Sequence, residues 1–183
     1  PQLRLTVNPV EGLAVYLCAM KPYIAYDETT GKEATSGMES SNVDSMFPKT
    51  ALGLDYELEG FNAGAGFAAN SFEIDNTADA ALHGKRVDSW IVYGHAGLQV
   101  SGLIFNFNAA YGQNPGNFGT MLMINLDESA PAAAIDEDAE GKKTVKNVRY
   151  YEAFAEIGYN YDIFTFMARS EERRVGKECR LTC

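Results

Sequence analysis

The sequence predicts an all-β chain in which antiparallel strands follow one another up and down, as in a barrel. First, apolar and polar residues alternate with a period of two over stretches of about ten residues, as in a strand with two unlike faces. Second, short turns alternate with long polar connections along the chain. Third, 17 Gly, 10 Tyr and 10 Phe are spread over the 183 residues, with a mean hydropathy of only −0.21. This mixture suits apolar residues that are dispersed one by one along the chain.

The clearest hairpin is predicted for residues 49–72. A first apolar set alternates with Gly53, Asp55 and Glu57. After Glu59-Gly60 the alternation resumes on the other parity, so a tight turn joins two antiparallel strands there. The apolar sets are Leu52, Leu54, Tyr56 and Leu58, and then Phe61, Ala63, Ala65 and Phe67.

Three more hairpins follow the same pattern. One spans residues 87–112 with a turn near Ser101-Gly102, and another spans residues 148–168 with a turn between Asn160 and Asp162. A weaker first hairpin consists of Leu3 to Val7 and Leu13 to Met20 on either side of a turn-rich connector, Asn8 to Gly12. We therefore expect seven or eight strands.

The connections between these hairpins indicate a membrane barrel. Residues 27–48, 73–85 and 114–147 are long and polar, whereas the turns within hairpins are short. This asymmetry is typical of transmembrane barrels, which have short periplasmic turns and long outer loops. No run approaches the roughly 18 apolar residues of a membrane helix, and strands of about ten residues match a tilted crossing. We expect a location in the bacterial outer membrane, in contact with its lipid.

The repeated strand-turn-strand units resemble those of the general porins of Gram-negative bacteria. The unit that carries the resemblance is LGLDYELEGFNAG, at residues 52–64, and the likeness covers residues 1–168. It rests on this alternation and has no unique signature motif. The resemblance implies a channel for passive diffusion of small hydrophilic solutes, with no cofactor and, as is usual among porins, a homotrimer.

The chain departs from the porin pattern in ways that predict a partial barrel. It opens directly in alternation, the strand number is about half that of barrels of roughly 16 strands, and no final strand ends in an aromatic residue. Residues 169–183, RSEERRVGKECRLTC, lose the alternation and become charged. This stretch resembles the end of a spurious or vector-derived reading frame, so we expect a barrel part at 1–168 and a non-native or disordered tail at 169–183.

Two sets of residues are predicted to have opposite surroundings. Polar residues of one strand face should line the lumen, where carboxylates outnumber cations and favour cations over anions. Aromatic residues near strand ends should form girdles at the lipid interface. The predicted pore-lining residues are Asp55, Glu57, Asn62, Asn70, Gln99, Asn106, Asn108, Glu152 and Glu156. The predicted girdle residues are Tyr16, Tyr56, Trp90, Tyr111, Tyr151 and Tyr159.

No pattern predicts catalysis, a metal site or nucleic-acid binding. No G-x-S-x-G turn is present, and Ser89 and His95 lie roughly 20 Å apart along one strand. His83 and His95 lack a second ligand at zinc spacing. The acidic residues of the last long loop carry the oxygen ligands that calcium binds, but their spacing does not match a calcium-binding loop. We therefore expect a solvated external loop there. A net charge of −10 argues against a phosphate backbone as partner.

Two questions stay open at this point. The apolar run Thr120 to Leu126 should be shielded from water. Either it packs against the inner wall of the barrel or a neighbouring subunit, or it forms an additional strand. The alternatives to a channel are a structural or adhesive membrane barrel that does not conduct, and a soluble β-barrel that binds a small apolar ligand. The soluble barrel requires Leu52, Leu54, Phe105 and Phe107 to point into a dry interior.

Overall fold

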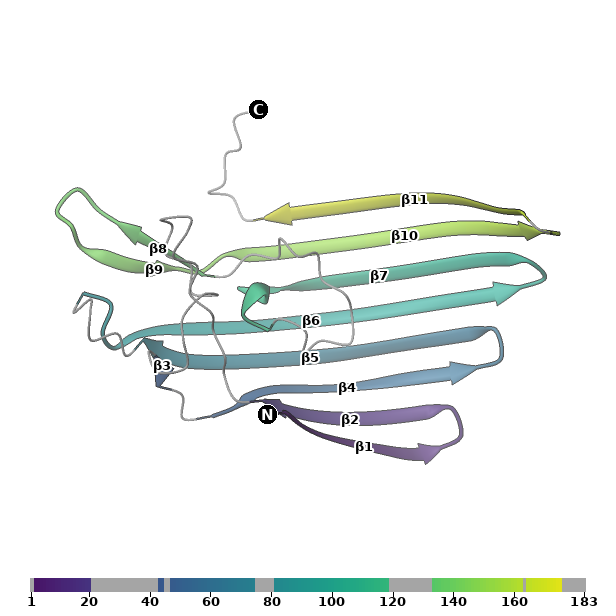
Figure 1. Ribbon diagram of the computed structural model, residues 1–183, viewed down its shortest axis with the longest axis horizontal. Coiled ribbons are helices and arrows are strands. Elements are labelled where there is room, and N and C mark those ends of the chain that lie inside the picture. Colours follow the sequence, from purple (N-terminus) through teal and green to yellow (C-terminus); the bar gives the residue numbers. More distant parts are fainter. Residues whose placement is uncertain are drawn as a thin grey trace.

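A computed structural model describes residues 2–20, 43–44, 47–74, 81–118, 133–162 and 164–175. Eight long strands lie side by side in one antiparallel sheet, in the order β1-β2-β4-β5-β6-β7-β10-β11 (Figure 1). The short strand β3 (Val43–Asp44) pairs with the end of β5. The eight strands are β1 (Gln2–Val10), β2 (Leu13–Met20), β4 (Lys49–Leu58), β5 (Phe61–Ile74), β6 (Lys85–Val100), β7 (Leu103–Gln113), β10 (Arg149–Tyr161) and β11 (Phe164–Val175).

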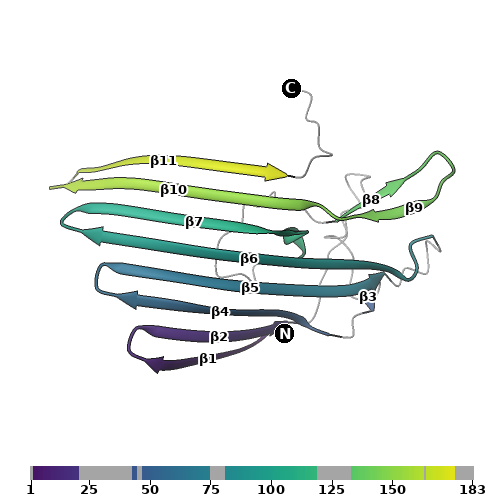
Figure 2. The same ribbon diagram turned by 180° about the vertical axis from the view of Figure 1, so that it is seen from behind.

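The turns of the pairs β1–β2, β4–β5, β6–β7 and β10–β11 lie at one end of the sheet, and the strand ends from which the long connections leave lie at the other (Figures 1 and 2). We call these the short-turn end and the loop end. The predicted all-β, up-and-down antiparallel fold with seven or eight strands is confirmed. One element was not predicted: part of the last long connection forms a small hairpin of β8 (Ala134–Glu137) and β9 (Lys143–Lys146). Among the described residues no helix is long and apolar enough to cross a membrane.

The pairing register gives the sheet two unlike faces. Leu54 lies opposite Ala65, so the apolar positions of neighbouring strands share one side of the sheet. Asp55 lies opposite Gly64, so the alternate positions share the other side. Leu52 is 52% exposed and Leu54 46%, so neither points into a packed interior. We call the side with Leu52 and Leu54 the apolar face and the side with Asp55 and Glu57 the polar face.

Glycine at positive φ makes the short turns possible. In the β4–β5 and β6–β7 turns the second residue is Gly60 at φ 73° and Gly102 at φ 84°, and Ser101 before Gly102 is also at positive φ. Positive φ at both turn residues, as at Ser101-Gly102, matches the twist of the flanking strands. At Gly60 the missing side chain allows positive φ without steric cost. The predicted turns at Glu59-Gly60 and Ser101-Gly102 are therefore confirmed.

The first hairpin differs from its prediction. The connector was expected to occupy residues 8–12, but β1 continues to Val10, and only Glu11 and Gly12 form the turn. The register shifts between Val7 and Val10, around Pro9. β1 is the edge of the sheet, where a proline without an N–H and a local irregularity cost little.

The end of the last strand does not coincide with the predicted boundary at residue 168. β11 pairs with β10 without a break as far as Val175, so residues 169–175 are strand. The face pattern does change there, since Ser170 and Glu172 follow Phe166 and Ala168 on the apolar face. The rest of the predicted tail, residues 176–183, lies outside the described part of the chain.

Buried apolar residues gather at the loop end. One cluster lies on the polar face and joins β2, β4, β5, β6 and β7 to Phe118. A second cluster lies where β5 and β6 extend beyond the shorter strands, and it includes Phe72, Val87 and Leu82 with Val145 of β9 packed against it. The loop end is therefore a packed region, whereas the short-turn end is a single layer.

Two tyrosines on the polar face close over two glycines. Tyr16 of β2 and Tyr93 of β6 lie on either side of Gly53 of β4 and Gly66 of β5, and their hydroxyl oxygens are 2.7 Å apart. A Cβ on Gly53 would lie 2.3 Å from the Tyr16 hydroxyl, and one on Gly66 would lie 2.5 Å from the Tyr93 ring. Only glycine leaves room for this bridge, which spans four strands.

We predict that Gly66→Ala lowers the free energy of unfolding by about 1–3 kcal/mol, because the Tyr93 ring must move. Gly94→Ala is the matched control, since its Cβ would meet only a backbone oxygen, Gly64 O, at 3.3 Å. Urea unfolding in detergent micelles measures both variants. Equal losses in the two variants would show that the Tyr16–Tyr93 bridge does not depend on Gly66.

Candidate functional site

The polar face brings together all nine residues that the sequence predicted for the lumen. One row crosses five strands at the short-turn end, from β4 to β10. Glu57 pairs with Asn62, Asn62 with Gly97, Gly97 with Asn106 and Asn106 with Glu156. The same register places the other predicted residues on this face. Gln99 lies next to the β6–β7 turn, and the remaining four lie closer to the loop end: Asp55, Asn70, Asn108 and Glu152.

Hydrogen bonds orient side chains within this row. Asn106 donates from Nδ2 to Oε1 of Glu156 over 2.9 Å, which connects β7 to β10. Gly97 lets the Asn62 amide lie over β6, since a Cβ at Gly97 would be 2.6 Å from the Asn62 nitrogen. The row therefore presents carboxylates and amides at the short-turn end.

The next row contains an acidic and a basic side chain on either side of a glycine. Nε2 of His95 lies 3.7 Å from Oδ1 of Asp55, and Gly64 is between them in the sheet. A Cβ at Gly64 would be 2.3 Å from the Asp55 oxygen, so the missing side chain allows the pair to approach. His95 thus faces the polar side as expected, beside a carboxylate.

The last two strands add further charged groups to the polar face. Tyr150 donates a hydrogen bond to Glu152. Arg169 of β11 pairs with Glu171 at 2.9 Å, and its guanidinium lies 4.5 Å from the ring centre of Phe154. Arg169 belongs to the predicted tail, yet in the sheet it shares the row of Glu156.

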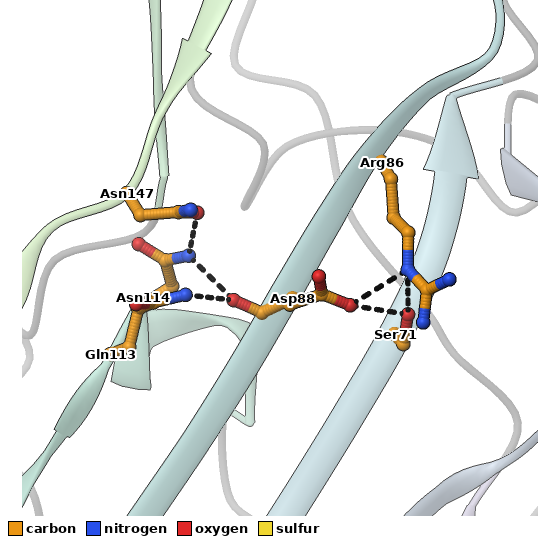
Figure 3. A network of polar contacts seen from close by, with 6 residues as sticks. All are labelled: Ser71, Arg86, Asp88, Gln113, Asn114 and Asn147. Carbon is orange, nitrogen blue, oxygen red and sulfur yellow. Dashed lines mark hydrogen bonds and ion pairs between the residues drawn. The ribbon is translucent and has the colours of Figure 1, made fainter.

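The chain that leaves β7 turns back onto the polar face, and Asn114 fixes this turn. Asn114 is fully buried and has a left-handed backbone, which asparagine tolerates. Its Nδ2 donates to the carbonyl of Asp88 at 2.9 Å and to Oδ1 of Asn147 at 2.8 Å. Its Oδ1 accepts from the Val148 backbone at 2.8 Å. Figure 3 shows Asn114 between Asn147 and Asp88, beside Gln113.

Beyond this anchor, a short 3-10 helix, η2 (Pro115–Asn117), lies against β6. Asn117 donates from Nδ2 to the hydroxyl of Ser89 at 2.8 Å. Phe118 is fully buried in the apolar cluster with Ile91 and Ala110. The run Thr120 to Leu126, for which an inner-wall contact or an additional strand was proposed, lies outside the described residues, but the residues just before it do contact the polar face.

Sequence reasoning interpreted the stretch after β7 only as the departure of a loop and missed the role of Asn114. A usable signal was present, because Asn-Pro directly after a strand marks a defined turn. The partners of Asn114, Asp88 and Asn147, are far from it in sequence, and nothing in the sequence identifies them.

Five of the six predicted girdle residues lie on the apolar face. Trp90, Tyr111 and Tyr151 are neighbours towards the loop end, where the Trp90 and Tyr111 rings meet edge to face at 5.5 Å and Arg149 lies 5.3 Å over Trp90. The other two are near the short-turn end. They are Tyr56 and Tyr159.

The sixth prediction, Tyr16, is wrong. Tyr16 is 2% exposed and lies on the polar face, where it forms the bridge to Tyr93. Its parity indicated this, since Leu13, Val15 and Leu17 take the apolar positions of β2. In a strand the parity of a residue, and not its position along the strand, decides the face on which it lies.

A polar cluster lies on the apolar face beyond Trp90, on the loop-end side of the aromatic residues. Asp88 Oδ1 accepts a 2.6 Å hydrogen bond from the Ser71 hydroxyl and forms an ion pair with Nε of Arg86 at 2.9 Å (Figure 3). Nε of Arg86 also donates a hydrogen bond to the Ser71 hydroxyl. Partial burial raises the pKa of Asp88, but the hydrogen bonds and the positive charge of Arg86 outweigh it, so this pKa lies below its ordinary value.

The acidic stretch of the last long connection forms a hairpin turn between β8 and β9. Oδ1 of Asp138 accepts hydrogen bonds from the backbone nitrogens of Glu140 and Lys142. No group of three metal-ligating side chains occurs among residues that the structure describes. His83 lies exposed in the turn before β6.

Comparison with known proteins supports the fold and leaves the family open. No family model and no curated protein matches the sequence. The chain is similar in structure to the outer membrane channel DcaP of Acinetobacter baumannii, with a TM-score of 0.59 at 12% sequence identity. The match covers 95% of this chain and 44% of that channel, so the chain spans less than half of its length. At this identity the likeness establishes the fold alone.

We predict that Asn114→Gly makes the turn after β7 more mobile. Glycine keeps access to the left-handed backbone but loses the three side-chain hydrogen bonds, at a cost of about 1–3 kcal/mol. Hydrogen exchange at Asn117 and Phe118 should accelerate, while exchange in β4 stays slow. Gln113→Ala is the comparison, because it removes one bond to the same Asp88 carbonyl. Unchanged exchange in Asn114→Gly would contradict the anchoring role.

We predict that Asp88 stabilises the fold at neutral pH and loses this effect in acid. Its pKa is lowered by folding, so the contribution is complete above the ordinary value of 3.8 and disappears as the pH falls through the lower value of the folded state. Urea midpoints of the wild type and of Asp88→Asn should converge as the pH falls below 3.8. Arg86→Gln should show the same convergence, and a constant difference between wild type and Asp88→Asn would refute the assignment.

Proposed function

We propose that this chain forms part of the wall of an outer-membrane channel through which small hydrophilic solutes diffuse passively. The observation that carries the proposal is the opposite polarity of the two faces of one continuous sheet. Exposed leucines and phenylalanines cover one face, and carboxylates and amides cover the other. In a membrane barrel, the first face meets lipid and the second surrounds water.

The spacing of the aromatic residues supports the lipid-facing assignment. Tyr151 and Tyr159 are eight residues apart on β10, which is about 27 Å of strand. A tilt of about 40° reduces this to roughly 20 Å of height, comparable with the apolar band of a membrane barrel. Their side chains are 37% and 48% exposed, as expected at a lipid interface.

The position of the chain after β7 supports a bore that is narrowed near the loop end. Phe118 and η2 occupy the polar face at the level of Ile91, while the rows of Asp55 and Glu57 stay uncovered and only partly buried. A bore of this form would restrict passage to small solutes. The Asn114 network would hold the constriction in place.

The charges support a preference for cations. Asp55, Glu57, Glu152 and Glu156 all belong to the polar face of β4 and β10. On the flanking strands the guanidinium groups of Arg4 and Arg169 each lie over an aromatic ring, at 4.9 and 4.5 Å. The field in the bore should then attract cations. A homotrimer in contact with outer-membrane lipid completes the proposal, as the resemblance to porins implied.

The competing interpretations differ in what they require. A soluble barrel for an apolar ligand would place Leu52, Leu54, Phe105 and Phe107 in a dry interior, but these side chains are 39% to 52% exposed. A membrane barrel that does not conduct shares the fold and the two faces. Conductance separates that barrel from a channel.

We predict that Glu57→Lys shifts the reversal potential in a salt gradient towards anions, because a positive charge replaces a negative one in the bore. Recordings of the purified protein in planar bilayers measure this shift. Glu140→Lys is the control: it makes the same charge change in the exposed turn between β8 and β9 and should leave the reversal potential close to that of the wild type. No conductance at all would refute the channel, and equal shifts would refute the cation preference.

A further inference from the structure

We propose that the short-turn end of the polar face contains a binding subsite for a small organic cation that carries hydrogen-bond donors. The proposal rests on the channel function and names a class of solute for it. The structure has a hollow of about 220 Å³ at this end, between the β4–β5 turn and the start of β7. The polar side chains that line it are Glu57, Asn62, Gln99 and Asn106.

Backbone features create this hollow. Gly60 belongs to its lining and has no side chain to fill it. Because Gly97 also lacks a side chain, the Asn62 amide lies over β6, as the 2.6 Å distance from a Cβ at Gly97 indicates. The volume is below the roughly 300–1,000 Å³ of pockets for drug-sized ligands, so the occupant must be smaller.

The lining presents more acceptors than donors. Glu57 offers a carboxylate, which only accepts hydrogen bonds when it is ionised. Asn106 donates one amide hydrogen to Glu156 over 2.9 Å, and this leaves its Oδ1 as an acceptor. Asn62 and Gln99 each add a carbonyl oxygen. An ammonium group brings three donors and a positive charge, so it fits this lining, whereas an anion would meet Glu57.

The second part of the ligand follows from the amides. Asn62 and Gln99 each carry an NH₂ group besides the carbonyl oxygen, and these groups donate to a hydroxyl or ether oxygen. A hydroxyl-bearing primary amine therefore uses both kinds of group in one small hollow. Ethanolammonium is the simplest probe of this class.

The test is a ligand-observed NMR titration of the detergent-solubilised protein with ethanolammonium chloride. Ethylene glycol and glycolate serve as neutral and anionic probes of similar size. We expect ethanolammonium to bind more tightly than both, and Glu57→Gln to weaken its binding about tenfold, the effect of losing one charged hydrogen bond. Glu11→Gln should leave the affinity unchanged, because it removes the same charge in the neighbouring turn outside the hollow. Circular dichroism confirms that each variant is folded.

The outcomes separate the subsite from the channel. Equal binding of the three probes, or equal affinity in the wild type and Glu57→Gln, overturns the subsite even if the protein conducts ions in a planar bilayer. Selective binding that Glu57→Gln abolishes supports the subsite, and a protein that binds in this way without conducting would overturn the channel alone.

Discussion

A buried or inner strand must have its backbone N–H and C=O groups paired with neighbouring strands, and the rest of this structure depends on that requirement. The ladder from β1 to β11 satisfies it for the inner strands of the sheet. Pairing also fixes which side chains meet, because a register shift of one residue would exchange the two faces. The tight turn at Glu59-Gly60 keeps Leu58 opposite Phe61, so apolar residues remain on one side from strand to strand.

The polar face is not uniform along the strands. Towards the loop end it is dry, and Ile91, Ala68 and Phe118 form a packed cluster there. Towards the short-turn end it carries carboxylates and amides, and glycines keep it open. The bridge between Tyr16 and Tyr93 marks the transition, since its rings belong to the packed part while its hydroxyl groups bond to each other. One face of the sheet thus provides both a packed support for the chain after β7 and an open row of carboxylates and amides.

Asp88 connects the two sides of the sheet at the loop end. Its carbonyl oxygen accepts hydrogen bonds from Gln113 and Asn114, which begin the turn onto the polar face. Its carboxylate lies on the apolar face and contacts Ser71 and Arg86 (Figure 3). The anchoring of the turn and the polar cluster beyond the aromatic residues therefore share one residue of β6. This arrangement explains why the extended part of β6 beyond Trp90 belongs to the structural core of the loop end.

The sequence by itself determined the eight long strands, the turns at Glu59-Gly60 and Ser101-Gly102 and the face of each predicted lumen residue, because a period of two and glycine-containing turns are local properties of the chain. It missed the β8–β9 hairpin and the continuation of β10 to Tyr161, inside the turn expected at Asn160 to Asp162. It failed at Tyr16, where parity was overlooked, and at Pro9, where the edge position of β1 permits a longer strand. Only the tertiary structure decided the partners of Asn114 and the pair of Asp55 with His95, since these contacts join residues that are distant in sequence. Register and packing create such contacts, and neither is encoded in a single strand.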